Sequence, residues 1–202
     1  SYRSTSLYEF FQNTSSTVPH KLKETYRSTF EIAEYSNNIF YDGILRVATN
    51  EEGLKTPEGT KPGFHWTDVS GPVVSAGKSG CVSENEVEEI YKLVKSILVD
   101  NIFKGTLGVV TPFRQQQKRL HDRIYDSDIP FENLESAQFI AETAHNFQGD
   151  ERDVMIFSLC AGEGMPRGSL HFISQNPHLF NVAVSRARAV MHIVGNKNWA
   201  EK

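Results

Sequence analysis

The chain has 202 residues, of which 39% are hydrophobic, and this length and composition allow one domain with a complete core. A formal net charge of −4 excludes a generally basic surface, so any nucleic-acid contact has to come from a local groove. The two cysteines form no CxxC pair, and no apolar run reaches the roughly 18 residues that a membrane span requires. These features predict a cytoplasmic protein without a membrane partner.

Three patterns divide the first third of the chain. Residues 1–20 are rich in Ser and Thr and predict a lead-in or linker segment, which leaves 21–202 as the folded domain. Between residues 21 and 45, apolar side chains indicate helical turns, and the Asp42-Gly43 pair is a helix-stop signal. The Gly- and Pro-rich residues 50–63 predict a mobile surface loop.

Strands and helices alternate through the rest of the chain. Ser83-x-x-Glu86 reads as a capping box, and the apolar residues behind it fall on one face of a helix. In chain order we expect strand 64–69, this helix from 83 to about 98, strand 107–111, helix 114–125, strand 137–141, strand 154–159, a Gly-rich loop at 161–168, helix 179–187 and strand 190–194. The alternation predicts an α/β fold, a predominantly parallel sheet with helices on both faces.

One segment superficially resembles a phosphate-binding P-loop. The P-loop has four residues between its first glycine and the Gly-Lys pair, so that consecutive amides wrap the phosphates. In Gly71–Ser79 five residues intervene, and the segment precedes the capped helix instead of opening it. We therefore expect an ordinary loop here and no tight ATP binding by this chain alone.

Two arginines lie between a predicted helix and a predicted strand. Planar guanidinium groups suit phosphate oxygens, and a guanidinium inserted into a neighbouring site is an arginine finger. Taken alone, Arg186-Ala-Arg188 would more often be a pair of solvated or salt-bridged arginines. The flanking sequences NVAVS and VMHIVGN favour the phosphate-directed interpretation.

The polar run Gln148–Glu151 follows Thr143 at a short distance. Together these residues could place a hydroxyl on a nucleic-acid phosphate and a carboxylate near a ribose or an arginine of a nucleotide site. A metal site at Asp150, Glu151 and Asp153 is the rival interpretation, but consecutive acids in a turn are usually solvent-facing. No histidine has ligand spacing, so we expect no metal ligands in this chain.

Four blocks in fixed order resemble the superfamily-one helicases. Thr106–Gln117, Glu142–Leu159 and Asn181–Asn196 are similar to helicase motifs IV, V and VI. Leu22–Leu45 resembles the segment that opens the second RecA-like domain in the branch containing the RNA helicase of nonsense-mediated decay and a replication helicase-nuclease. The resemblance implies a RecA-like P-loop NTPase fold without its own P-loop, and stepping in the 5′-to-3′ direction.

The resemblance also implies a nucleotide site shared between two domains. Arg27 and Arg186 would reach the γ-phosphate of ATP as catalytic arginine fingers, with ATP and Mg²⁺ held mainly by a first RecA-like domain of the same polypeptide. Tyr26 would lie near the adenine. Other cofactor-binding residues would line or support the cleft: Gln148, Gly149, Glu151 and Arg188.

Single-stranded DNA or RNA is the implied second partner. Its backbone or bases would contact Thr143 and the loop of Thr111, Pro112 and Phe113. Two departures from the family pattern are present. Ser28-Thr29-Phe30 replaces Met-His-Pro after the Tyr-Arg pair, and Ser185 replaces a common threonine while keeping its hydroxyl.

The chain contains no Walker A motif and no acidic Walker B motif. Because it also opens on Ser1 without a natural start, we expect a fragment of a longer helicase that is inactive in isolation. The alternatives are a non-enzymatic nucleic-acid-binding or interaction module that keeps the helicase fold, and a nuclease using the three acids of 150–153.

Overall fold

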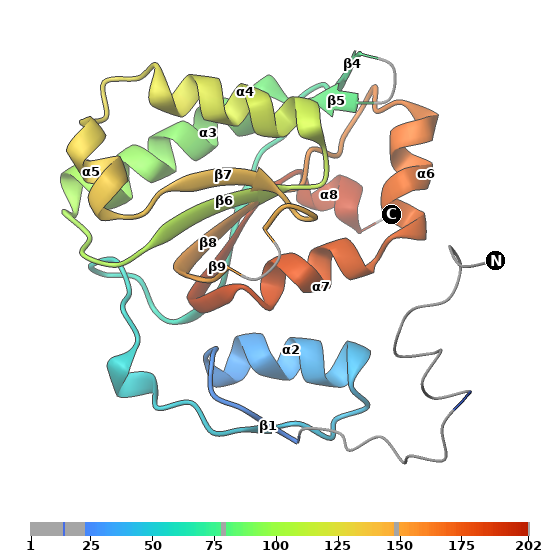
Figure 1. Cartoon of the computed structure of the whole chain (residues 1–202). Helices are drawn as coiled ribbons and strands as arrows, with labels where there is room; N and C mark the ends of the chain where they lie inside the picture. The colour runs from blue at the N-terminus through green and yellow to red at the C-terminus, as the bar shows by residue number, and fades with distance from the viewer. Residues whose placement is uncertain (1–13, 15–22, 78–79, 148–149, 202) are drawn as a thin grey trace.

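A five-stranded, entirely parallel sheet forms the centre of the computed structural model, which describes residues 14, 23–77, 80–147 and 150–201 (Figure 1). The spatial order is β3-β9-β8-β6-β7, and neighbouring strands are parallel throughout. The strands are β3 (Gly63–Asp68), β6 (Leu107–Thr111), β7 (Ile140–Thr143), β8 (Arg152–Ser158) and β9 (Ala187–Gly195). Every side chain of β6 and β8 is buried, as expected for strands covered on both faces.

One face of the sheet carries three helices, the longer two of which lie above it in Figure 1 and the short third at its left end. They are α3 (Glu84–Lys95), α4 (Arg114–Tyr125) and α5 (Phe131–Ser136), and α3 continues into the π-helical turn η2 (Ser96–Asp100). Alternate strand residues such as Leu107, Val109 and Ile156 pack against Ile90 and Leu120 of these helices. This is the larger of the two cores that flank the sheet.

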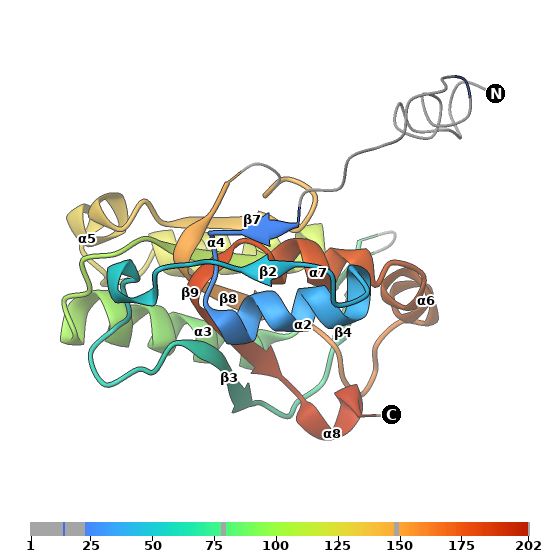
Figure 2. The ribbon, with the colours of Figure 1, turned by 90° about the horizontal axis from the view of Figure 1, so that it is seen from below.

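The opposite face carries α2 (Phe30–Phe40) and α7 (His178–Val184), seen from below in Figure 2. The intervening strand residues, among them Met155 and Phe157, pack against Ile32 and Val184 of these helices. A short parallel pair, β1 (Glu24–Thr25) with β2 (Arg46–Val47), flanks α2. Helices on both faces of a parallel sheet confirm the predicted α/β fold.

A third group of elements gathers beyond the carboxyl ends of the strands, on the right of Figure 1. The antiparallel hairpin β4 (Val74–Ala76) and β5 (Gly80–Val82) and the helix α6 (Arg167–Gln175) enclose a small apolar cluster. Its buried members are Val73, Cys81, Phe113 and Cys160. The remaining elements are η1 (Glu51–Gly53) and α8 (Lys197–Ala200), and among the described residues no helix is both long and apolar enough to cross a membrane.

Several predicted boundaries are corrected by the structure. The strand expected at 137–141 begins three residues later, because α5 occupies the preceding segment and Gln138 adopts a left-handed φ of 47°. The predicted loop at 161–168 ends in the first turn of α6, and the segment that resembled a P-loop contributes the hairpin β4–β5. The predicted linker, residues 1–20, lies outside the described residues apart from Thr14.

The predicted capping box at α3 is wrong, although the helix itself is confirmed. The Ser83 side chain makes no capping hydrogen bond, and its backbone N–H donates instead to Gln116 Oε1 at 3.0 Å. Glu86 turns into the protein, where one carboxylate oxygen accepts hydrogen bonds from Ser158 Oγ at 2.7 Å and from the Cys160 N–H at 2.8 Å. Glu86 is therefore a buried bridge between α3 and the end of β8.

Candidate functional site

Four charged residues gather where β8 and β9 begin, and we call them the arginine rim: Arg27, Glu151, Arg186 and Arg188. Arg27 precedes α2, Glu151 precedes β8, and Arg186 and Arg188 flank the first residue of β9. Up to 161 positions separate these residues in the sequence. The fold thus brings together the predicted finger residues, the predicted cleft carboxylate and the supporting arginine on one edge of the sheet.

Arg27 is held on both sides. Its Nε donates to Glu151 Oε2 at 2.6 Å, and its Nη1 donates to the backbone carbonyl of Ser185 at 3.1 Å. The next two residues continue the attachment, since Ser28 Oγ donates to the Ala187 carbonyl at 2.6 Å and the Thr29 N–H donates to the Arg188 carbonyl at 2.9 Å. Residues 27–29 are therefore hydrogen-bonded to the backbone of residues 185–188, the segment that contains Arg186 and Arg188.

Arg186 differs from its neighbours in forming no ion pair with the described residues. Its Nε is buried and has no hydrogen-bond partner among the described residues. Burial lowers the pKa of Arg186, and the nearby positive charge of Arg27 lowers it further, while Glu151 and Asp150 act in the opposite direction. An unpaired, partly desolvated guanidinium is unfavourable until an anion reaches it, so this position is suited to an incoming phosphate.

The acidic residues near the rim are each paired with an arginine. Asp150 Oδ1 accepts from Arg152 Nη1 at 2.5 Å, and this hydrogen bond lowers the pKa of Asp150. Asp153 Oδ1 accepts from Arg188 Nη1 at 3.3 Å. Their carboxylates are therefore engaged by cations of the chain itself, and within the described ranges no group of three or more His, Cys, Asp or Glu could hold a metal ion.

Tyr26 stands at the outer end of the rim, next to Arg27. Its side chain is 67% exposed, and its hydroxyl donates to Glu24, which raises the pKa of Tyr26. A pocket of about 140 Å³ adjoins Arg27 and is lined in part by Ser36, Tyr41 and Ser185. The predicted cofactor-binding residues Gln148 and Gly149 lie outside the described residues.

The predicted nucleic-acid residues lie at the other end of the sheet. Thr111 and Thr143 are the last residues of the adjacent strands β6 and β7 and are partners in register. The arginine rim, in contrast, stands where strands begin. The two groups of candidate residues thus lie at opposite ends of the strands of the same parallel sheet.

Most of these nucleic-acid candidates are buried. The exposed fractions of Thr111, Phe113 and Thr143 are 1%, 4% and 8%, and only Pro112 is partly exposed. Phe113 packs into the apolar cluster with Cys81 and Cys160, which covers most of its side chain. Contact of these side chains with a nucleic-acid strand stays a prediction.

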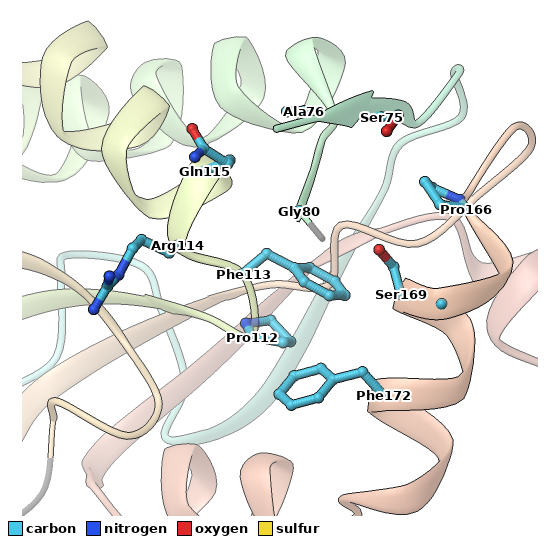
Figure 3. Close-up of a pocket in the computed structure, with 11 residues that line it drawn as sticks. Ser75, Ala76, Gly80, Pro112, Phe113, Arg114, Gln115, Pro166, Ser169 and Phe172 are labelled. Carbon is cyan, nitrogen blue, oxygen red and sulfur yellow. The ribbon is translucent and has the colours of Figure 1, made fainter. Parts of the chain in front are cut away.

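A pocket of about 510 Å³ opens above Pro112 and Phe113 (Figure 3). Arg114 and Gln115 line it from α4, and Ser169 and Phe172 line it from α6. Arg114 is exposed, and its side chain makes no hydrogen bond or ion pair with the described residues. Sequence patterns do not indicate this pocket, because they predict loops where α6 begins and where the hairpin β4–β5 completes the wall.

The chain belongs to the AAA domain family, whose model matches residues 3–198. Among curated proteins it is 28% identical over 189 residues to "Regulator of nonsense transcripts 1" of Caenorhabditis elegans, covering 88% of this chain and 17% of that protein. It is 32% identical over 198 residues to "Probable RNA helicase armi" of Drosophila melanogaster, covering 87% and 16%. The "ATP-dependent helicase upf1" of Schizosaccharomyces pombe is 26% identical over 190 residues, covering 88% and 20%.

The predicted resemblance to superfamily-one helicases is therefore confirmed at the level of the domain. The chain spans about a fifth or less of the length of these relatives. Among solved structures, the C-terminal domain of a possible DNA helicase from Lactobacillus plantarum matches with a TM-score of 0.48 and 16% identity, covering 85% of this chain and 88% of that one.

Proposed function

We propose that this chain is the second motor domain of an ATP-dependent helicase, and that its arginine rim completes a nucleotide site on a first RecA-like domain of the same polypeptide. Relatives whose names include helicases support the class of activity. The observation that carries the assignment of residues is Arg186, whose buried Nε lacks a partner among the described residues, beside the positively charged Arg27.

The chemistry of phosphoryl transfer explains why such a rim is useful. Negative charge spreads over the oxygens of the transferred phosphoryl group, and catalysis consists mainly of positioning and of electrostatic stabilisation. Arg186 and Arg27 would supply two guanidinium groups to the γ-phosphate, with Arg188 and Glu151 in support. Mg²⁺ and most contacts to ATP would come from the first domain, and Tyr26, Gln148 and Gly149 would flank the nucleotide.

Single-stranded DNA or RNA would run along the opposite edge of the sheet. Pro112 and Arg114 offer accessible groups there, and Thr111, Phe113 and Thr143 shape the surface behind them. Phosphate contacts of this kind are largely indifferent to base sequence and weaken with salt. Closure of the two domains around ATP would then move the nucleic-acid contacts of this domain relative to those of the first domain. A cytoplasmic location is part of the same proposal.

Steady-state ATP hydrolysis by the full-length polypeptide, with and without a single-stranded oligonucleotide, tests the assignment. The substitution Arg186→Ala is expected to lower kcat about 10³-fold, the smallest effect typical of an arginine finger. Arg186→Lys keeps the charge without the planar fork and should recover only part of this loss. Arg119→Ala is the matched control, because Arg119 pairs with Glu84 on the outer surface of α4 at 2.8 Å.

Wild-type turnover in the Arg186→Ala protein would show that the rim is not the catalytic element proposed. Absence of hydrolysis by the wild-type polypeptide, together with retained oligonucleotide binding, would instead support the non-enzymatic binding module.

A further inference from the structure

Asp153 is a buried carboxylate at the start of β8, directly behind the arginine rim. Its side chain is only 5% exposed, whereas those of Arg27, Glu151 and Arg188 are 39–43% exposed. A carboxylate is costly to bury unless hydrogen bonds and a cation compensate for the lost hydration. Its partners therefore indicate what it does.

One oxygen of Asp153 is fixed to the neighbouring strand. Oδ2 accepts hydrogen bonds from the Thr106 N–H at 2.9 Å and from Thr106 Oγ1 at 3.0 Å. The Asp153 N–H in turn donates to Thr106 Oγ1 at 2.9 Å. This closed set of three bonds ties the carboxylate to the residue that precedes β6, so the second oxygen has a defined direction.

That second oxygen begins a series of contacts that reaches the exposed rim. Asp153 Oδ1 accepts from Arg188 Nη1 at 3.3 Å, and Arg188 Nε lies 3.7 Å from Glu151 Oε1. The other oxygen of Glu151 accepts from Arg27 Nε at 2.6 Å. The series thus starts at a rigid buried anchor and ends at an exposed guanidinium.

We propose that Asp153 is a positioning residue, which orients Arg188 and, through Glu151, aims Arg27 toward the nucleotide. The inference rests on the proposed function of the rim. Three neighbouring guanidinium groups repel one another and would spread into solvent without fixed counter-charges. Holding them in place before ATP arrives lowers the entropic cost of assembling the site. Asp153 does not contact substrate in this scheme.

The test uses the full-length polypeptide and a double-mutant cycle in ATP hydrolysis. Asp153→Asn keeps the shape of the side chain and removes its charge, and it should lower kcat/KM for ATP about tenfold. Arg188→Gln should have a similar effect. Because both changes interrupt the same series, the double variant should be no worse than the poorer single variant. A role confined to folding would move thermal stability and would not produce this non-additivity.

Two further variants protect the test against misfolding. Thr106→Ala removes the hydroxyl that holds Asp153 and should lower kcat/KM, while Thr106→Ser keeps the hydroxyl and should retain it. Asp128→Asn is the matched control, because the Asp128 carboxylate accepts hydrogen bonds from Tyr91 and Lys95 on the outer surface, away from the rim.

The possible failures are distinguishable. If Arg186→Ala abolishes hydrolysis but Asp153→Asn matches the wild type, or if the effects of Asp153→Asn and Arg188→Gln multiply, the positioning role is wrong and the proposed function stands. If Arg186→Ala is itself without effect, the proposed function fails first.

Discussion

Replacing Glu86 by glutamine is expected to change how the stability of the fold depends on pH. Glu86 is 1% exposed, and burial raises its pKa from the ordinary 4.5 to about 7, against the opposing effect of its hydrogen bonds from Cys160 and Ser158. At about 1.4 kcal/mol per pKa unit, this shift corresponds to about 3 kcal/mol.

The sign follows from which state loses the proton first. As the pH rises above 4.5, the unfolded chain releases the Glu86 proton while the folded chain retains it. The contribution of this group to stability is therefore complete below pH 4.5 and is lost as the pH rises through about 7.

His192 acts in the opposite direction and partly conceals the effect. Burial, with a smaller contribution from His65, lowers the pKa of His192 from 6.5 to about 4. Its contribution is complete above pH 6.5 and is lost as the pH falls through about 4. Between pH 4.5 and 6.5 the two slopes oppose each other, so the wild-type profile alone is not diagnostic.

The measurement is the free energy of unfolding by urea at pH 5, 6, 7 and 8 for the wild type and for Glu86→Gln. The difference between the two should shift in favour of the variant as the pH rises, by up to about 3 kcal/mol over this range. Glu84→Gln is the control, since Glu84 is a half-exposed glutamate of the same helix turn. A difference between Glu86→Gln and wild type that is constant from pH 5 to 8 would refute the reasoning.

Two further substitutions separate folding from binding at the carboxyl ends of the strands. Thr111→Val should change the free energy of unfolding by no more than about 1 kcal/mol, because the buried Thr111 Oγ1 has no hydrogen-bond partner among the described residues. If denaturation by urea showed a loss of stability of more than about 2 kcal/mol, Thr111 Oγ1 would have to form a hydrogen bond in the folded protein. Arg114→Ala in the full-length polypeptide should weaken binding of single-stranded oligonucleotides of any sequence and reduce the salt slope of log K by about 1. An unchanged slope in a binding titration across salt concentrations would exclude a phosphate contact.

The sequence allows the sheet to be predicted better than its surroundings. The bounds of β6 and α4 agree with the expected ranges, because a mostly apolar run and a helical pattern adjoin with a Pro between them. Helices α5 and α6 were not predicted, since each follows a proline without a side-chain cap and is short. Local patterns are weakest for elements of this kind, which depend on tertiary packing.

The candidate site shows a similar limit. The motifs select Arg27, Glu151 and Arg186, but the pairing of Arg27 with Glu151 joins positions 124 apart and has no local signature. Glu86 illustrates the converse error. Its spacing from Ser83 matched a capping box, while its true partners lie more than 70 positions away, at Ser158 and Cys160.

The connection from β7 to β8 has a mechanical consequence. Because both strands point the same way, the chain that leaves Thr143 at one end of the sheet has to return to the other end before Arg152, a height of about 20 Å at 3.3 Å per residue. At the start of this connection, Ala144 and Phe147 are buried in the core that α2 and α7 cover. Thr143 therefore cannot shift without disturbing the packing of the two buried residues that follow it in the chain.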